Sequence, residues 1–175
     1  MDKKIKPIVE SELPSQFIYD LGLYLQTCAH IETSVCSLIC STEGLIDGDK
    51  EHVLRFHQLR KLGVSDLIKQ LRKSSKTLDP ENSDLLSTLA NWLGTYQTNR
   101  HIAAHGAFYV EQGSNVLRVI YSHKRKSHGE FIYESEETVV DRDLALQLIE
   151  DADRILRSVV GLDTAIQRGE VLLRK

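Results

Sequence analysis

The period at which apolar residues recur changes twice along this chain of 175 residues, and that change limits the folds open to it. Up to about residue 105, apolar residues follow one another at steps of three and four, which is the period of an amphipathic helix. From 107 to 140 they alternate with polar residues and are rich in Val, Ile, Tyr and Phe, which is typical of β-strands. From 141 onward the helical spacing returns. The sequence therefore predicts a mainly α protein, a four- to five-helix antiparallel bundle with a small three-stranded antiparallel β insert before the last helix.

Capping residues and glycines set the expected bounds of the helices. The first helix is predicted over 13–43, and the long helix before the strands is expected over 84–105. The residues expected to begin the later helices carry capping side chains and are Asp49, Ser65, Ser83 and Asp141. The glycines expected to end helices are Gly44, Gly63 and Gly106.

The alternating segments predict strands over 107–112, 115–124 and 129–140, with a short turn at 112–115. A longer second turn, KRKSHG, is expected at 124–129. We therefore expect one helical domain over 1–175, with the β insert at 107–140 inside it.

Composition limits the partners and the cellular location expected for the chain. The net charge of −3 gives no overall attraction to nucleic acid, so any RNA contact requires a local basic patch. No apolar run has the ~7–15 residues of a signal peptide core or the ~20 residues of a membrane helix. The three cysteines, Cys28, Cys36 and Cys40, are an odd number on one predicted helix, which favours reduced thiols over a disulfide framework. These features predict a soluble, cytoplasmic protein with no membrane partner.

The segment TNRHIAAHGAFYV, residues 98–110, concentrates ionisable side chains where the period changes. His101 and His105 are four residues apart, so a helix projects them from one side. Arg100 and His105 are five apart, about 140° around a helix at ~100° per residue. Arg100 and His105 therefore converge on one ligand only through the length of arginine, through loosening near Gly106, or across a partner surface.

The run from Arg100 to His105 resembles the Arg-x4–6-His motif of the HEPN superfamily, whose core is a helical bundle with this motif near the C-terminal end of one helix. The resemblance covers the order of the helices and this motif. His101 stands where the family most often has Asn, and the β insert lies outside the family's minimal core. The resemblance implies a metal-independent endoribonuclease that acts as a homodimer with a composite active site and needs no cofactor.

On this resemblance Arg100 and His105 are catalytic. Histidine titrates near neutrality and transfers protons, and arginine binds phosphate oxygens as a fixed cation. Asn99 and His101 are then expected to position the substrate. A two-fold axis resolves the 140° separation because each copy supplies groups to the other. The resemblance also implies an RNA substrate, a toxin or phage-defence setting, and an antitoxin protein as partner.

Two further groups are candidate site residues. Glu32 lies beside the apolar stripe of the first helix and either holds Arg100 or a histidine in place or is exposed. Lys124, Arg125 and Lys126 lie at the expected hairpin tip and either bind RNA or form a solvated turn.

Three other interpretations of the motif remain open at the level of sequence. A histidine near a helix C-terminus is favoured by the helix dipole alone, and Arg100 can pair with Glu150 or Asp151. A HEPN-like bundle without catalysis can bind RNA or a protein partner. His101 and His105 also have the spacing of a zinc half-site that Cys36 and Cys40 could complete, but the glutamate of HExxH is missing, and we expect no metal.

Overall fold

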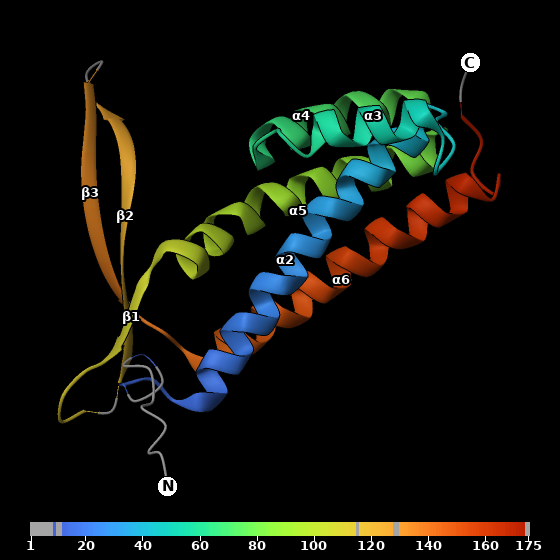
Figure 1. Ribbon diagram of the computed structural model, residues 1–175. Helices are drawn as coiled ribbons and strands as arrows, with labels where there is room; N and C mark the ends of the chain where they lie inside the picture. Colours follow the sequence, from blue (N-terminus) through green and yellow to red (C-terminus); the bar gives the residue numbers. More distant parts are fainter. Residues whose placement is uncertain (1–8, 10–11, 115, 128–129, 174–175) are drawn as a thin grey trace, which may run out of the picture. The chain divides into compact units, whose positions relative to one another are not determined.

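The computed structural model describes residues 9, 12–114, 116–127 and 130–173, with the side chains of residues 125–127 outside the description (Figure 1). The described part holds five α-helices, one 3₁₀ helix and one three-stranded antiparallel sheet. This confirms the predicted fold class, with the sheet directly before the last helix. The elements in chain order are α2 (Ser15–Thr42), α3 (Lys50–Leu59), α4 (Val64–Ser74), the 3₁₀ helix η1 (Ser75–Thr77), α5 (Pro80–His105), β1 (Ala107–Val110), β2 (Leu117–Ser127), β3 (Glu130–Val139) and α6 (Arg142–Gln167).

The chain divides into two compact units, and each of the three long helices passes from one unit to the other. The sheet unit comprises Met1–Leu25 and Arg100–Ile149, and the helical unit comprises Gln26–Asn99 and Glu150–Lys175. The sheet unit therefore holds the first turns of α2 and α6, the last turns of α5 and all three strands.

The helical unit contains most of the buried apolar side chains. In it α4 runs antiparallel to α5, because Ser65 bonds to Gln97 and Arg72 bonds to Asn91. The C-terminal ends of α2 and α6 meet through a hydrogen bond of 2.6 Å from the Ser41 hydroxyl to a carboxylate oxygen of Asp163. The apolar side chains that are fully or almost fully buried here include Ile31, Val35, Leu38, Ile39, Leu59, Leu71, Leu78, Leu86, Leu89 and Val159.

The sheet has the strand order β1-β2-β3, and β2 and β3 form a long hairpin (Figure 1). Cross-strand pairs include Tyr109 with Arg118 and Lys124 with Tyr133. One face of the sheet contacts the first turns of α2, where the ring centroids of Phe17 and Phe108 lie 5.0 Å apart. Most side chains of β3 are exposed to solvent, so little of this strand is covered by other elements.

Three helix bounds differ from expectation. The second helix ends at Leu59 rather than at Gly63, and Gly63 is the N-cap of α4. Ser65 is therefore inside α4, where its hydroxyl bonds to Gln97. The expected start at Ser83 is also wrong, because α5 begins at Pro80.

The start of α5 has a local cause. A carboxylate oxygen of Asp79 accepts a hydrogen bond from the backbone N–H of Asn82, and the Asp79 carbonyl accepts one from the N–H of Ser83. A hydrogen bond from the side-chain amide of Asn82, followed by the one from its backbone N–H, holds the pKa of the Asp79 carboxyl below its usual value. Proline suits the first position of a helix, where its missing N–H is not needed. From Asp79 and Pro80 the sequence predicted a loop, since a residue before proline is disfavoured in the helical conformation. In the structure the pair is the cap and first turn of α5.

Other expected bounds are confirmed. Asp49 is the N-cap of α3, and the Asp141 carboxylate accepts a hydrogen bond from the N–H of Asp143 at the start of α6. Gly44 follows α2 with φ of 78°, the left-handed conformation in which glycine is favoured.

The prediction of a turn at 124–129 is wrong at its start. Strand β2 continues to Ser127, so Lys124, Arg125 and Lys126 belong to the strand. Each of these three residues lies opposite a residue of β3 in the strand register, and a run of charges does not by itself prevent a strand. None of the helices described combines the length and apolar composition that a membrane span requires.

Candidate functional site

The two histidines of the motif lie side by side at the end of α5. Their ring centroids are 4.8 Å apart with an angle of 53° between the ring planes, and both residues are exposed. Arg100, directly before His101, is half-buried in the same sheet unit. The expected pairing of His101 with His105 on one helix side is therefore confirmed, and both imidazoles are accessible from solvent.

Gly106 sets the place at which the helix becomes a strand. Its N–H donates to the carbonyl of Ile102 at 2.8 Å, which completes the last turn. A Cβ at this position would lie 2.5 Å from Cγ2 of Val119 on β2 and 2.6 Å from the Ile102 carbonyl oxygen. Only a residue without a side chain lets the helix end this close to the sheet. The position of His105 relative to the strands therefore depends on Gly106.

The remaining site residues of the motif hypothesis fall in the helical unit. Asn99 is half-buried and is the last α5 residue of that unit. Glu32 is half-buried on α2 and lies close enough to Cys36 to raise the pKa of that thiol, an effect smaller than that of burial. On α6, Asp151 pairs with Arg154 at 3.4 Å.

The cysteines are core residues. All three are free and buried. Burial raises the pKa of Cys36 and of Cys40 from 9.0 to about 11, so both thiols stay protonated at neutral pH. Metal ions bind the thiolate form, which burial disfavours here. Among the residues that the structure describes, no group of three or more His, Cys, Asp or Glu side chains could hold a metal ion.

Of the three expected basic residues on the hairpin, only Lys124 has a described side chain. Its ammonium nitrogen lies 3.7 Å from the ring centroid of Phe131 and 5.9 Å from that of Tyr133. The side chains of Arg125 and Lys126 lie outside the described part of the chain. Sequence reasoning assigned the basic run but missed the aromatic rings, because Phe131 and Tyr133 match an ordinary strand pattern.

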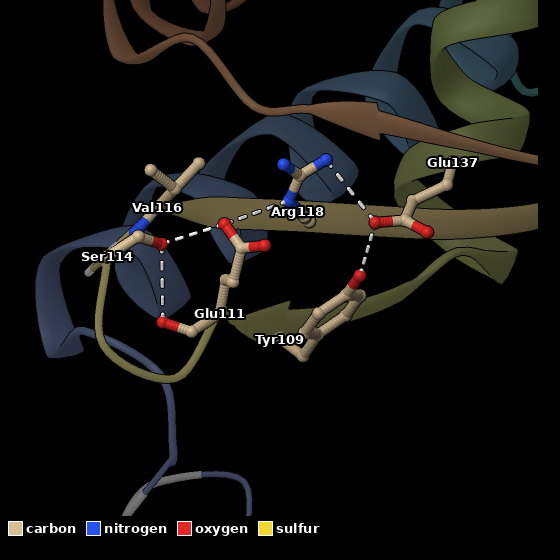
Figure 2. A network of polar contacts seen from close by, with 6 residues as sticks. All are labelled: Tyr109, Glu111, Ser114, Val116, Arg118 and Glu137. Atoms are coloured by element: carbon tan, nitrogen blue, oxygen red, sulfur yellow. Dashed lines mark hydrogen bonds and ion pairs between the residues drawn. The ribbon is translucent and has the colours of Figure 1, made fainter.

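A polar network joins the three strands on the face of the sheet that also carries Lys124 (Figure 2). The Arg118 guanidinium contacts Glu111 at 3.3 Å and Glu137 at 3.3 Å. The Tyr109 hydroxyl donates to Glu137, and this bond raises the pKa of Tyr109. The pKa of Glu111 is lowered, mainly by a hydrogen bond from the Ser114 hydroxyl and secondly by the nearby positive charge of Arg118. Two carboxylates thus neutralise Arg118, and nothing in the sequence pattern indicated this network.

The opposite face of the hairpin carries a histidine between two carboxylates. His123 lies 3.5 Å from a carboxylate oxygen of Glu134 and 3.6 Å from one of Glu136. The Tyr121 hydroxyl donates to Glu136 at 2.6 Å, which raises the pKa of Tyr121. The two faces of one hairpin therefore carry different polar contacts.

Comparisons with models of protein families, with curated proteins and with solved structures find no match to this chain.

Proposed function

We propose that this chain is a metal-independent endoribonuclease of HEPN type that acts as a homodimer. The observation that carries the proposal is the exposed pair of imidazoles at the end of α5, with His101 directly after Arg100 and His105 one turn further on. His105 is exposed and no described residue forms a hydrogen bond with its ring, so the ring is open to a substrate. This favours catalysis over a non-catalytic bundle.

The chemistry needs only groups that this motif supplies. The 2′-hydroxyl of RNA loses a proton and attacks the adjacent phosphorus, and the bond from phosphorus to the 5′-oxygen breaks. The leaving 5′-oxygen takes up a proton. His105 transfers protons at near-neutral pH, and Arg100 stabilises the negative charge on the phosphate oxygens. His101 and Asn99 position the substrate, and a second copy supplies a second His105, so that one His105 removes a proton and the other donates one.

Cleavage of mixed RNA by the purified chain in the presence of EDTA tests the proposal. We expect RNA fragments with 2′,3′-cyclic phosphate and 5′-hydroxyl ends. His105→Ala and Arg100→Ala are each expected to slow cleavage at least ~100-fold, the usual scale for losing a proton-transfer or charge-stabilising group. His57→Ala, at an exposed histidine on α3, is the matched control and retains the parent rate. Equal cleavage by the parent and His105→Ala would show that His105 is not catalytic.

A further inference from the structure

The hairpin carries an exposed aromatic pair beside an ordered cation. Phe131 and Tyr133 are 60% and 75% exposed, although large aromatic side chains are usually among the more buried residues of a domain. They are two residues apart on β3, so they lie on the same face of the sheet, ~7 Å apart along the strand. Lys124 is the cross-strand partner of Tyr133 and lies over the Phe131 ring. We call these three residues, Lys124, Phe131 and Tyr133, the aromatic patch.

We propose that the aromatic patch binds single-stranded RNA, with a base stacked on Tyr133 and a backbone phosphate on the Lys124 ammonium. Aromatic side chains that stack on bases beside basic groups are the usual means of binding single strands without sequence preference. The choice of RNA as ligand rests on the proposed ribonuclease function. The patch lies in the same compact unit as Arg100 and His105.

The distribution of charge favours the aromatic patch over the rest of the hairpin as a site for an anionic ligand. Closer to β1 the same face holds Arg118, whose charge two carboxylates already neutralise. In the patch itself, no described carboxylate pairs with Lys124. On the opposite face, His123 already has carboxylate oxygens of Glu134 and Glu136 at 3.5 Å and 3.6 Å. The aromatic patch is therefore the part of the hairpin that complements a polyanion.

The neighbouring residues on this face suit a nucleotide as well. The hydroxyls of Ser122 and Ser135 lie 2.8 Å apart next to the patch, and they can donate to or accept from a base edge or a 2′-hydroxyl. The cation–π contact holds the Lys124 ammonium in a defined place before any ligand binds, which reduces the ordering cost of a phosphate contact.

A second copy of this chain fits the patch less well than RNA does. A two-fold axis through the patch would bring two Lys124 ammonium groups together, with no described acid in the patch to separate them. The patch thus favours an anionic ligand over self-association.

Fluorescence anisotropy with a short, labelled 2′-O-methyl oligouridine in EDTA tests the proposal, because this RNA binds but has no 2′-hydroxyl to react. Tyr133→Ala is expected to raise the Kd by about 5- to 150-fold, the effect of losing one stacked base. Tyr133→Phe keeps the ring and is expected to bind within about twofold of the parent. Lys124→Met is expected to reduce the slope of log K against log salt by ~0.7, the value for one phosphate contact. Tyr19→Ala, at another exposed tyrosine of the sheet unit, is the control and binds like the parent.

The outcomes separate this inference from the nuclease. Parent-like binding by Tyr133→Ala overturns the inference, as does a parent that fails to bind the oligouridine. A change in sedimentation coefficient in Tyr133→Ala would make the patch a contact between copies and would also overturn it. If binding depends on Tyr133 but the parent cleaves no RNA, the nuclease proposal fails and the binding site stands. If the parent cleaves RNA and binding is independent of Tyr133, the reverse holds.

Discussion

At the scale of single residues, Gly106 has a structural role that its lack of a side chain explains. Helix α5 ends at His105, and the chain must then enter β1 directly beside Val119, one of the few fully buried side chains of the sheet unit. The space beside Gly106 is already filled by Val119 and by the carbonyl of Ile102. Packing, rather than a role in catalysis, therefore requires glycine at position 106, next to His105.

We expect Gly106→Ala to lower the free energy of unfolding by ~1–3 kcal/mol, because the added methyl group overpacks this junction. Gly94→Ala, in the same helix, is the matched control because a Cβ there meets nothing within 4 Å. That substitution is expected to raise stability by ~0.5–1 kcal/mol, since alanine favours a helix over glycine. Urea unfolding of both variants measures the difference. A Gly106→Ala protein as stable as Gly94→Ala would mean that the junction has room to relax.

At the scale of elements, α2 buries two thiols one turn apart in the helical unit. Cys36 and Cys40 are both 0% exposed, and burial is the largest cause of their raised pKa values. Their packing among aliphatic side chains makes this stretch of α2 a core helix. It follows that ionising either thiol opposes folding.

This predicts a pH dependence with a definite sign. Below the ordinary thiol pKa of 9.0, both thiols are protonated whether the chain is folded or unfolded. As pH rises from there to about 11, the unfolded chain releases these protons and the folded chain retains them. The free energy of unfolding then falls by up to ~1.4 kcal/mol per pH unit for each thiol.

Urea unfolding of the parent and of a Cys36→Ala, Cys40→Ala variant, at about pH 8 and about pH 10.5, measures this contribution. Other groups titrate over the same range, so the variant provides the baseline. We expect stability to fall more in the parent than in the variant between the two pH values. Equal losses would show that the thiols ionise as readily in the folded chain as in the unfolded one.

At the scale of the whole molecule, the proposed reaction requires two copies of the chain. One α5 end supplies one Arg100 and an adjacent pair of imidazoles from the same side of one helix, whereas the reaction moves protons at two separate oxygens. A shared site makes the activity depend on both copies at once. The assembly can therefore be tested through the rate of cleavage.

We expect His105→Ala to suppress the parent when the two are co-expressed in one cell and purified together. If every active site needs a His105 from each copy, activity follows the square of the parent fraction, because only dimers of two parent chains are active. A chain that acts alone gives activity proportional to that fraction. RNA cleavage measured at several mixing ratios separates the two relations. Co-expression with His57→Ala controls for dilution, and a linear relation for His105→Ala would rule out the shared site.

Local sequence determined the elements of this protein. Hydrophobic period is a property of consecutive residues, so it predicted the helices, the sheet before the last helix and the place of His101 and His105 on one side of α5. Capping chemistry is also local, and the Asp141 carboxylate bonds to the start of α6 as that chemistry predicts. Asp49 is the correct N-cap of α3 by position, without a capping bond from its side chain. The Asp79–Pro80 start was missed because the same pair is equally typical of a loop.

Only the tertiary structure decided which side chains from distant segments of the chain are in contact. The contact of Lys124 with Phe131 and Tyr133 depends on the register of β2 against β3, and a shift by one residue would move each side chain to the other face. The neutralisation of Arg118 by Glu111 and Glu137 joins residues from separate parts of the insert. The need for glycine at 106 likewise arises from Val119, thirteen positions along the chain. These are pairings between distant segments, and no periodicity within one segment specifies them.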